Sequence, residues 1–131
     1  MHEEKKVEQA VGMPAGEALD LSSLVAYQEG SIVSRTLAKR NGGTVTLFAF
    51  DAEQALSEHT VPFDAIAQVL DGDAELTIGG NKVSARAGQT VLMPANIPHA
   101  VYAPQRFKML LTMVREVHTS SAGARGIEKL S

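Results

Sequence analysis

Short apolar segments broken by turn residues, at intervals of about 8 to 12 residues, fill the middle of this chain and are typical of a β-sandwich or β-barrel. Segments 31–39 and 44–50 are β-branched and apolar, and Asn41-Gly42-Gly43 between them provides the positive φ angles of a hairpin turn. Gly79-Gly80-Asn81 indicates a second hairpin, because apolar and polar residues alternate before it. No long amphipathic helix competes with this pattern, so the sequence predicts an all-β fold of about eight strands.

Glycine and proline residues further along the chain divide the rest of it into expected turns, loops and strands. Asp71-Gly72 is expected to be a turn, and residues 51–58 a loop. Prolines frame a rigid bend at residues 94–98. The strands expected after residue 85 are 90–93, 99–103 and 107–114.

Length and composition limit the architecture to one domain. The chain has 131 residues, enough for a single core and too few for two. Residues 1–16 and 116–131 lack strand periodicity and are rich in polar and small residues, so we expect a flexible or arm-like N-terminal tail and a polar C-terminal tail. A single barrel domain is expected over residues 17–115.

Charge and cysteine content exclude several classes of function. The net charge is −3 and no long basic stretch occurs, which disfavours nucleic acid as a partner. There is no cysteine, so thiolate chemistry and sulfur-ligated metal sites are excluded. No apolar run has the length of a signal peptide core or a membrane span, so we expect a cytoplasmic protein with no membrane partner.

The segment from residue 88 to 103 carries the more complete of two motifs. Gly88 is followed after five residues by Pro94, and His99 lies five positions after that proline. This arrangement resembles the second motif of the cupin family. The sequence departs from that motif at Asn96, where glycine is usual, and at Ala103, where asparagine is usual.

The first cupin motif is matched only in outline, over residues 58–72. His59 and Gly72 are in place, whereas Val61 and Ala65 stand where the motif has its second histidine and its glutamate. The resemblance covers about residues 31–114 and is to small single-domain, RmlC-like cupins. It implies a double-stranded β-helix, that is, a jelly-roll barrel of two antiparallel sheets.

The resemblance also implies where a metal would bind. Metal-binding cupins use three histidines and one carboxylate, and this sequence keeps His59 and His99 alone. Zinc, iron, nickel or manganese generally needs three or four protein ligands, so any divalent metal held by two imidazoles would bind weakly. Asp64 is next to the vacated glutamate position, but strand alternation turns it to the opposite face unless the strand bulges.

We therefore expect the protein to bind a small organic molecule in the barrel mouth, through polar contacts on apolar walls. The residues expected to form this pocket are His59, Asp64, Gln68, Met93, His99 and Met109. Two alternatives remain open: a metal-dependent oxygenase or a sugar or keto-acid isomerase, and a structural or interaction module with a filled barrel. No catalytic residue can be assigned.

Segments 44–50 and 107–114 are apolar on both alternating faces, which indicates that their outer face is also covered. We therefore expect a homodimer that pairs through the outer sheet and the N-terminal strand.

Overall fold

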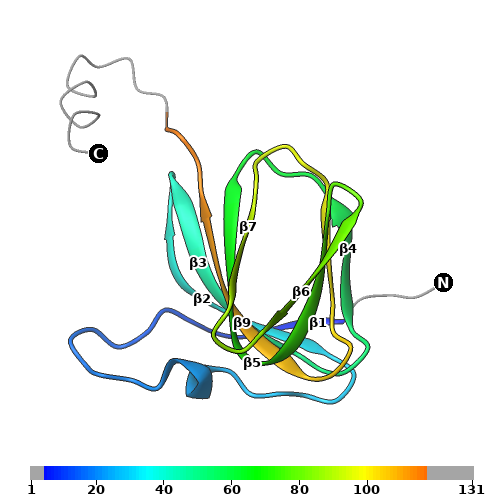
Figure 1. The fold of residues 1–131 in the computed structure, drawn as a ribbon. Coiled ribbons are helices and arrows are strands. Elements are labelled where there is room, and N and C mark those ends of the chain that lie inside the picture. The colour runs from blue at the N-terminus through cyan, green and yellow to red at the C-terminus, as the bar shows by residue number, and fades with distance from the viewer. Residues whose placement is uncertain (1–4, 118–131) are drawn as a thin grey trace, which may run out of the picture.

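The computed structural model describes residues 5–117, except for the side chains of Gln9 and Ala10 (Figure 1). The chain expected to form the C-terminal tail, from residue 118 onward, lies outside this range. Nine strands and one short 3₁₀ helix form the described part. They are β1 (Lys6–Val11), η1 (Leu21–Leu24), β2 (Ile32–Arg40), β3 (Gly43–Phe50), β4 (Ala55–His59), β5 (Asp64–Ile78), β6 (Asn81–Arg86), β7 (Thr90–Met93), β8 (His99–Tyr102) and β9 (Phe107–Val114).

The expected all-β class and both hairpins are confirmed. β2 pairs with β3 across the Asn41-Gly42 turn, and β5 pairs with β6 across Gly79-Gly80. Two local predictions are wrong. Residues 55–59 form β4 where a loop was expected, because they pair with the distant β8. Asp71-Gly72 is not a turn between two strands but lies inside one long strand, β5.

β5 belongs to both walls of the barrel. Its first half pairs with β9 and β7, and its second half pairs with β6 and β8. The change occurs next to a register irregularity between Val69 and Asp71, and Gly72 takes a φ of 73°. In Figure 1 the strand descends on one side, curls beneath the barrel and rises on the other. A bulge and a glycine bend thus close the sheet on itself.

The N-terminal segment adds a strand to the fold. Residues 6–11, expected within an arm-like tail, form β1, which pairs in parallel with β2 of the same chain. The sheets are therefore antiparallel apart from this one edge pairing. Residues 12–30, including η1, lie across the outer face of β2, β3 and β9. Val33 and Leu47 are buried there, and Lys108 donates a hydrogen bond to the carbonyl of Ser22.

The main core lies inside the barrel. Phe50 and Phe107 stack with a centroid separation of 4.5 Å, next to the bend in β5. Around them, the inward residues of β5 are small or medium-sized: Ala65, Ala67, Val69 and Ala74 are all buried. In the part of the chain that the structure describes, no helix is long and apolar enough to cross a membrane.

Candidate functional site

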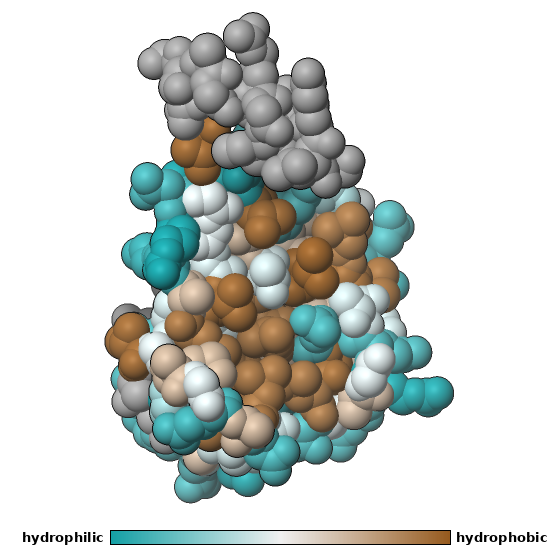
Figure 2. Space-filling view, turned by 90° about the vertical axis from the view of Figure 1, so that its left-hand side faces the viewer, coloured by the Kyte–Doolittle hydropathy of each residue, from teal (hydrophilic) through white to brown (hydrophobic). Residues whose placement is uncertain are grey.

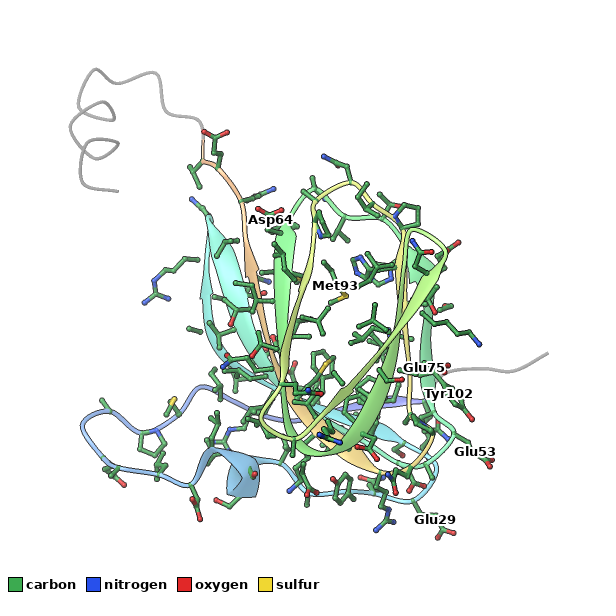
Figure 3. The ribbon with its side chains drawn as sticks, viewed as in Figure 1. Glu29, Glu53, Asp64, Glu75, Met93 and Tyr102 are labelled. Carbon is green, nitrogen blue, oxygen red and sulfur yellow. The ribbon has the colours of Figure 1, made fainter. Side chains whose placement is uncertain are left out.

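A cavity of about 450 Å³ lies inside the barrel, and its wall is largely apolar. The lining side chains come from six strands and from the segment after β4. The strands are β1, β3, β4, β7, β8 and β9. The lining side chains are Lys6, Phe48, Leu56, Ser57, His59, Val61, Met93, His99, Val101, Met109, Leu111 and Met113. Figure 3 shows Met93 pointing into the barrel, whereas Glu75 and Tyr102 lie on the outside of the opposite wall. Another hollow, beside Asp73 and Arg86, is more polar.

His59 and His99 meet in this cavity. They are direct partners in the antiparallel β4–β8 pairing, so their side chains emerge on the same face. The ring centroids are 4.5 Å apart and the ring planes are inclined by 67°, an edge-to-face arrangement. His99 is only 4% exposed, whereas His59 is exposed and lies where the cavity opens to solvent.

Backbone contacts fix which nitrogen of each ring carries the proton. Nδ1 of His59 lies 3.0 Å from the carbonyl oxygen of Ser57, and Nδ1 of His99 lies 3.3 Å from that of Ile97. A carbonyl oxygen only accepts hydrogen bonds, so in both pairs the Nδ1–H is the donor. In a neutral imidazole this leaves Nε2 without a proton. The neutral pair therefore offers two hydrogen-bond acceptors.

Burial lowers the pKa of His99. Desolvation disfavours the charged imidazolium, and the nearby His59 adds a repulsive charge, while the hydrogen bond to Ile97 acts in the opposite direction. The ordinary pKa of this group is 6.5. At neutral pH, His99 is therefore an uncharged acceptor.

This shift predicts a pH-dependent stability. Below pH 6.5 the unfolded chain takes up a proton at His99 before the folded chain does, so the free energy of unfolding falls as the pH drops from 7.5 toward 5.5. The contribution of this one proton is at most about 1.4 kcal/mol per pH unit. Urea denaturation at several pH values measures it. His99→Gln should flatten the dependence, and an unchanged slope in that variant would exclude His99 as its source.

The side chains that the structure describes do not fit a metal ion held by the protein. Among the described residues, no group of three or more histidine, cysteine, aspartate or glutamate side chains is placed to bind one. Val61 lines the cavity as an apolar residue, and Ala65 is fully buried in the core. Within residues 5–117, two imidazoles remain, which is fewer than the three or four ligands that such ions take, and no carboxylate joins them to offset the charge.

Of the six residues predicted to form the pocket, four line the cavity: His59, Met93, His99 and Met109. Asp64 and Gln68 do not, because alternation along β5 points their neighbours Ala65 and Ala67 inward. Asp64 is exposed, and its Oδ1 accepts a hydrogen bond of 2.9 Å from the amide of Ala95. Gln68 is exposed on the outer face, opposite Thr90 and Leu110.

Sequence reasoning missed several lining residues. Leu56 and Ser57 were missed because their segment was taken as a loop, and Lys6 because its segment was taken as a tail. For Lys6, a weak signal was present: valines at positions 7 and 11 flank polar residues, as in an edge strand. Val61 was considered only as the replacement for a metal ligand.

Comparisons with known proteins identify close relatives of this fold. A family model described as a cupin domain matches residues 46–115. A conserved protein of unknown function from Streptococcus pyogenes is 37% identical, with a TM-score of 0.79, and the match covers 82% of this chain and 94% of that one. A cupin superfamily protein from Desulfitobacterium hafniense is 28% identical, with a TM-score of 0.76 and coverages of 80% and 96%.

A cupin 2 conserved barrel domain protein from Leptotrichia buccalis is 38% identical, with a TM-score of 0.72. That match covers 74% of this chain and 47% of the other, so it spans about half of the Leptotrichia protein. Among curated proteins there is no match. The solved structures confirm the expected jelly-roll barrel.

Proposed function

This chain belongs to the cupin family, and on that premise we propose that it binds a small, largely apolar organic molecule in the barrel cavity, with His59 and His99 as its polar contacts. The observation that carries the proposal is the edge-to-face imidazole pair on a largely apolar wall. Buried polar groups are normally hydrogen-bonded, so the acceptor of the buried His99, with that of the exposed His59 beside it, favours a ligand with a hydroxyl or amine donor.

The size and flexibility of the cavity support the same proposal. Its volume of about 450 Å³ lies within the range of small-molecule sites, which are concave and mostly apolar with a few polar groups. Met93, Met109 and Met113 line it, and methionine side chains adapt their shape to a ligand. A filled barrel would leave no such volume, so the structural-module alternative has less support.

A metal-dependent reaction has less support as well, because no third ligand accompanies the two imidazoles among the described residues. The proposal therefore concerns binding and assigns no reaction.

The test is a thermal-shift screen of small hydroxyl- and amine-bearing compounds, followed by calorimetry of the compounds that stabilise the protein. His99→Leu should lower the affinity for a hydroxyl-bearing ligand by about tenfold, the loss expected for one buried hydrogen bond. It should leave the deoxy analogue of that ligand unaffected. Tyr102→Phe is the matched control, since Tyr102 is on the same strand but faces outward. Absence of any ligand in the screen, or equal binding by His99→Leu, would contradict the proposal.

We also propose that two copies pair through the outer face of the sheet formed by β3, β9, β5 and β7. Residues 12–30 cover only part of the outer surface, and Figure 2 shows an apolar surface beside them. Leu92 is 56% exposed and Val114 is 46% exposed. Val45, Ile66 and Thr112 on the same face are uncharged, so two copies can meet over these residues without charge repulsion. The charged Asp64, opposite Val114, lies where β5 begins.

Leu92→Asp should therefore convert a dimer into a monomer, because it places a charge on the apolar face at an exposed position. Light scattering coupled to size-exclusion chromatography measures the mass directly. Tyr102→Asp, an exposed position on the opposite wall, should leave the mass unchanged. A wild-type protein with the mass of one chain at micromolar concentration would contradict this interface.

A further inference from the structure

His59 and His99 present two hydrogen-bond acceptors close together. Directly opposite positions of an antiparallel pair carry their side chains on the same face, and here the ring centroids are 4.5 Å apart. Both Nδ1 atoms donate to backbone carbonyl oxygens, those of Ser57 and Ile97. The two Nε2 atoms are therefore the acceptors, and a single small molecule in the cavity can reach both.

Neither imidazole can satisfy the other in this protonation state. Two Nε2 atoms without protons both accept, so no hydrogen bond can form between them. His99 is only 4% exposed, and a buried acceptor is normally hydrogen-bonded. The pair is thus complementary to a molecule that brings two donors, one for each ring.

We propose that the ligand is a neutral aromatic molecule with hydroxyl groups on two adjacent ring carbons, a catechol, and that one hydroxyl donates to Nε2 of each histidine. This inference rests on the proposed function and names the class of molecule bound. A single hydroxyl donates to one ring at a time, whereas two adjacent hydroxyls donate to both. The rigid ring that carries them loses little conformational freedom on binding.

The cavity lining favours neutral hydroxyl groups over an ammonium group. An alkyl amine is protonated at neutral pH, and burying its charge is costly unless an opposite charge accompanies it. No lining side chain in the described part of the chain is a carboxylate. Two hydroxyls bring the same donors without a net charge.

The rest of the cavity wall suits an aromatic ring. Phe48 lines the cavity and is held in place from behind, because its ring packs on Phe50 with a centroid separation of 6.0 Å. Met93 points into the barrel from the opposite sheet edge (Figure 3), and Met109 also lines the cavity. Aromatic rings and thioether sulfurs both pack favourably on another aromatic ring, beyond the effect of the buried area.

The experiment is isothermal titration calorimetry of the full chain, with oxygen excluded, and three matched probes: 4-methylcatechol, 4-methylphenol and 2-methoxy-4-methylphenol. We expect the catechol to bind about tenfold more tightly than either monohydroxy probe, the difference expected for one additional buried hydrogen bond. His59→Leu should remove this difference, because only the acceptor of His99 remains. Glu58→Leu is the matched control: it changes the preceding residue of β4, which is exposed and does not line the cavity.

The outcomes separate this inference from the proposed function. Equal affinity for the three probes, or a catechol preference that survives His59→Leu, would overturn the inference and leave the proposed function standing. The same holds if other compounds of the screen bind and the catechol does not. If neither the probes nor any compound of the screen binds, both proposals fail. The comparison of probes on the wild-type chain needs no variant, and circular dichroism verifies that both variants retain the fold.

Discussion

Gly72→Ala should lower the free energy of unfolding by about 4 kcal/mol, a large part of the stability of a small domain. A Cβ at this position would lie 3.0 Å from Cα of Phe107 and closer still to the carbonyl oxygen of Arg106. Both are backbone atoms: Phe107 is the first residue of β9 and pairs with Gly72, and Arg106 directly precedes it, so neither can move without disturbing the ladder. The φ of 73° adds a further cost for any residue with a side chain.

Gly80→Ala provides the matched control. Gly80 has a similar φ of 86°, but a Cβ there would have nothing within 4 Å. Its expected loss is therefore only the cost of the left-handed conformation, about 1 kcal/mol. Urea denaturation followed by circular dichroism measures both variants. Equal losses in the two would show that the close approach of β5 and β9 at Gly72 does not matter for stability.

The double substitution Val61→His and Ala65→Glu should raise the affinity for zinc or nickel by at least about a hundredfold, because four ligands replace two. Val61 already lines the cavity beside His59, so an imidazole there points at the existing pair. Ala65 faces inward but is fully buried opposite Met93 and Met113, so a glutamate must displace a methionine side chain. The single variant Val61→His therefore serves as a comparison, because it gives a site of three histidines without crowding the methionines around position 65.

Glu58→His is the matched control for this gain of binding. It adds a histidine next to His59, at an exposed position that does not line the cavity. Calorimetry with each metal, on protein without a histidine tag, measures the affinities. If the folded double variant binds no more tightly than Glu58→His, the alignment of the first motif with residues 59–72 is wrong.

The sequence predicted those parts of the fold that depend on local turn chemistry. The glycines and asparagines at 41–43 and 79–81 place both hairpins correctly, and the prolines at 94 and 98 separate β7 from β8. Strands whose identity depends on distant partners were missed. β4 is polar in its second half and forms by pairing with β8, and β1 forms by pairing with β2.

Gly72 shows why the same local signal has two meanings. Asp-Gly usually indicates a turn that reverses the chain, and here the glycine instead allows one strand to bend and continue. Nothing within a few residues distinguishes the two cases, because the second half of β5 is held by β6 and β8. From the sequence alone, a turn is therefore predicted at Asp71-Gly72, and β5 is divided into two strands.

The histidine pair was predictable in part. The motif spacing placed His59 and His99 on separate strands, and the structure brings their rings together. Alternation from Ala65 correctly turns Asp64 away from the cavity, and the same reasoning applies to Gln68. Lys6 could not be placed, because the charge reaches the cavity only through the parallel pairing of β1 with β2.

The long strand β5 joins the two walls of the barrel, yet in the described chain no side chain of β5 lines the cavity. The residues that line the cavity belong instead to the strands around it and to the segment after β4. The connection between the walls and the lining of the cavity are thus encoded in different segments. A library varied at Phe48, Val61 and Met113 can therefore change the shape of the cavity while the connection between the walls stays the same.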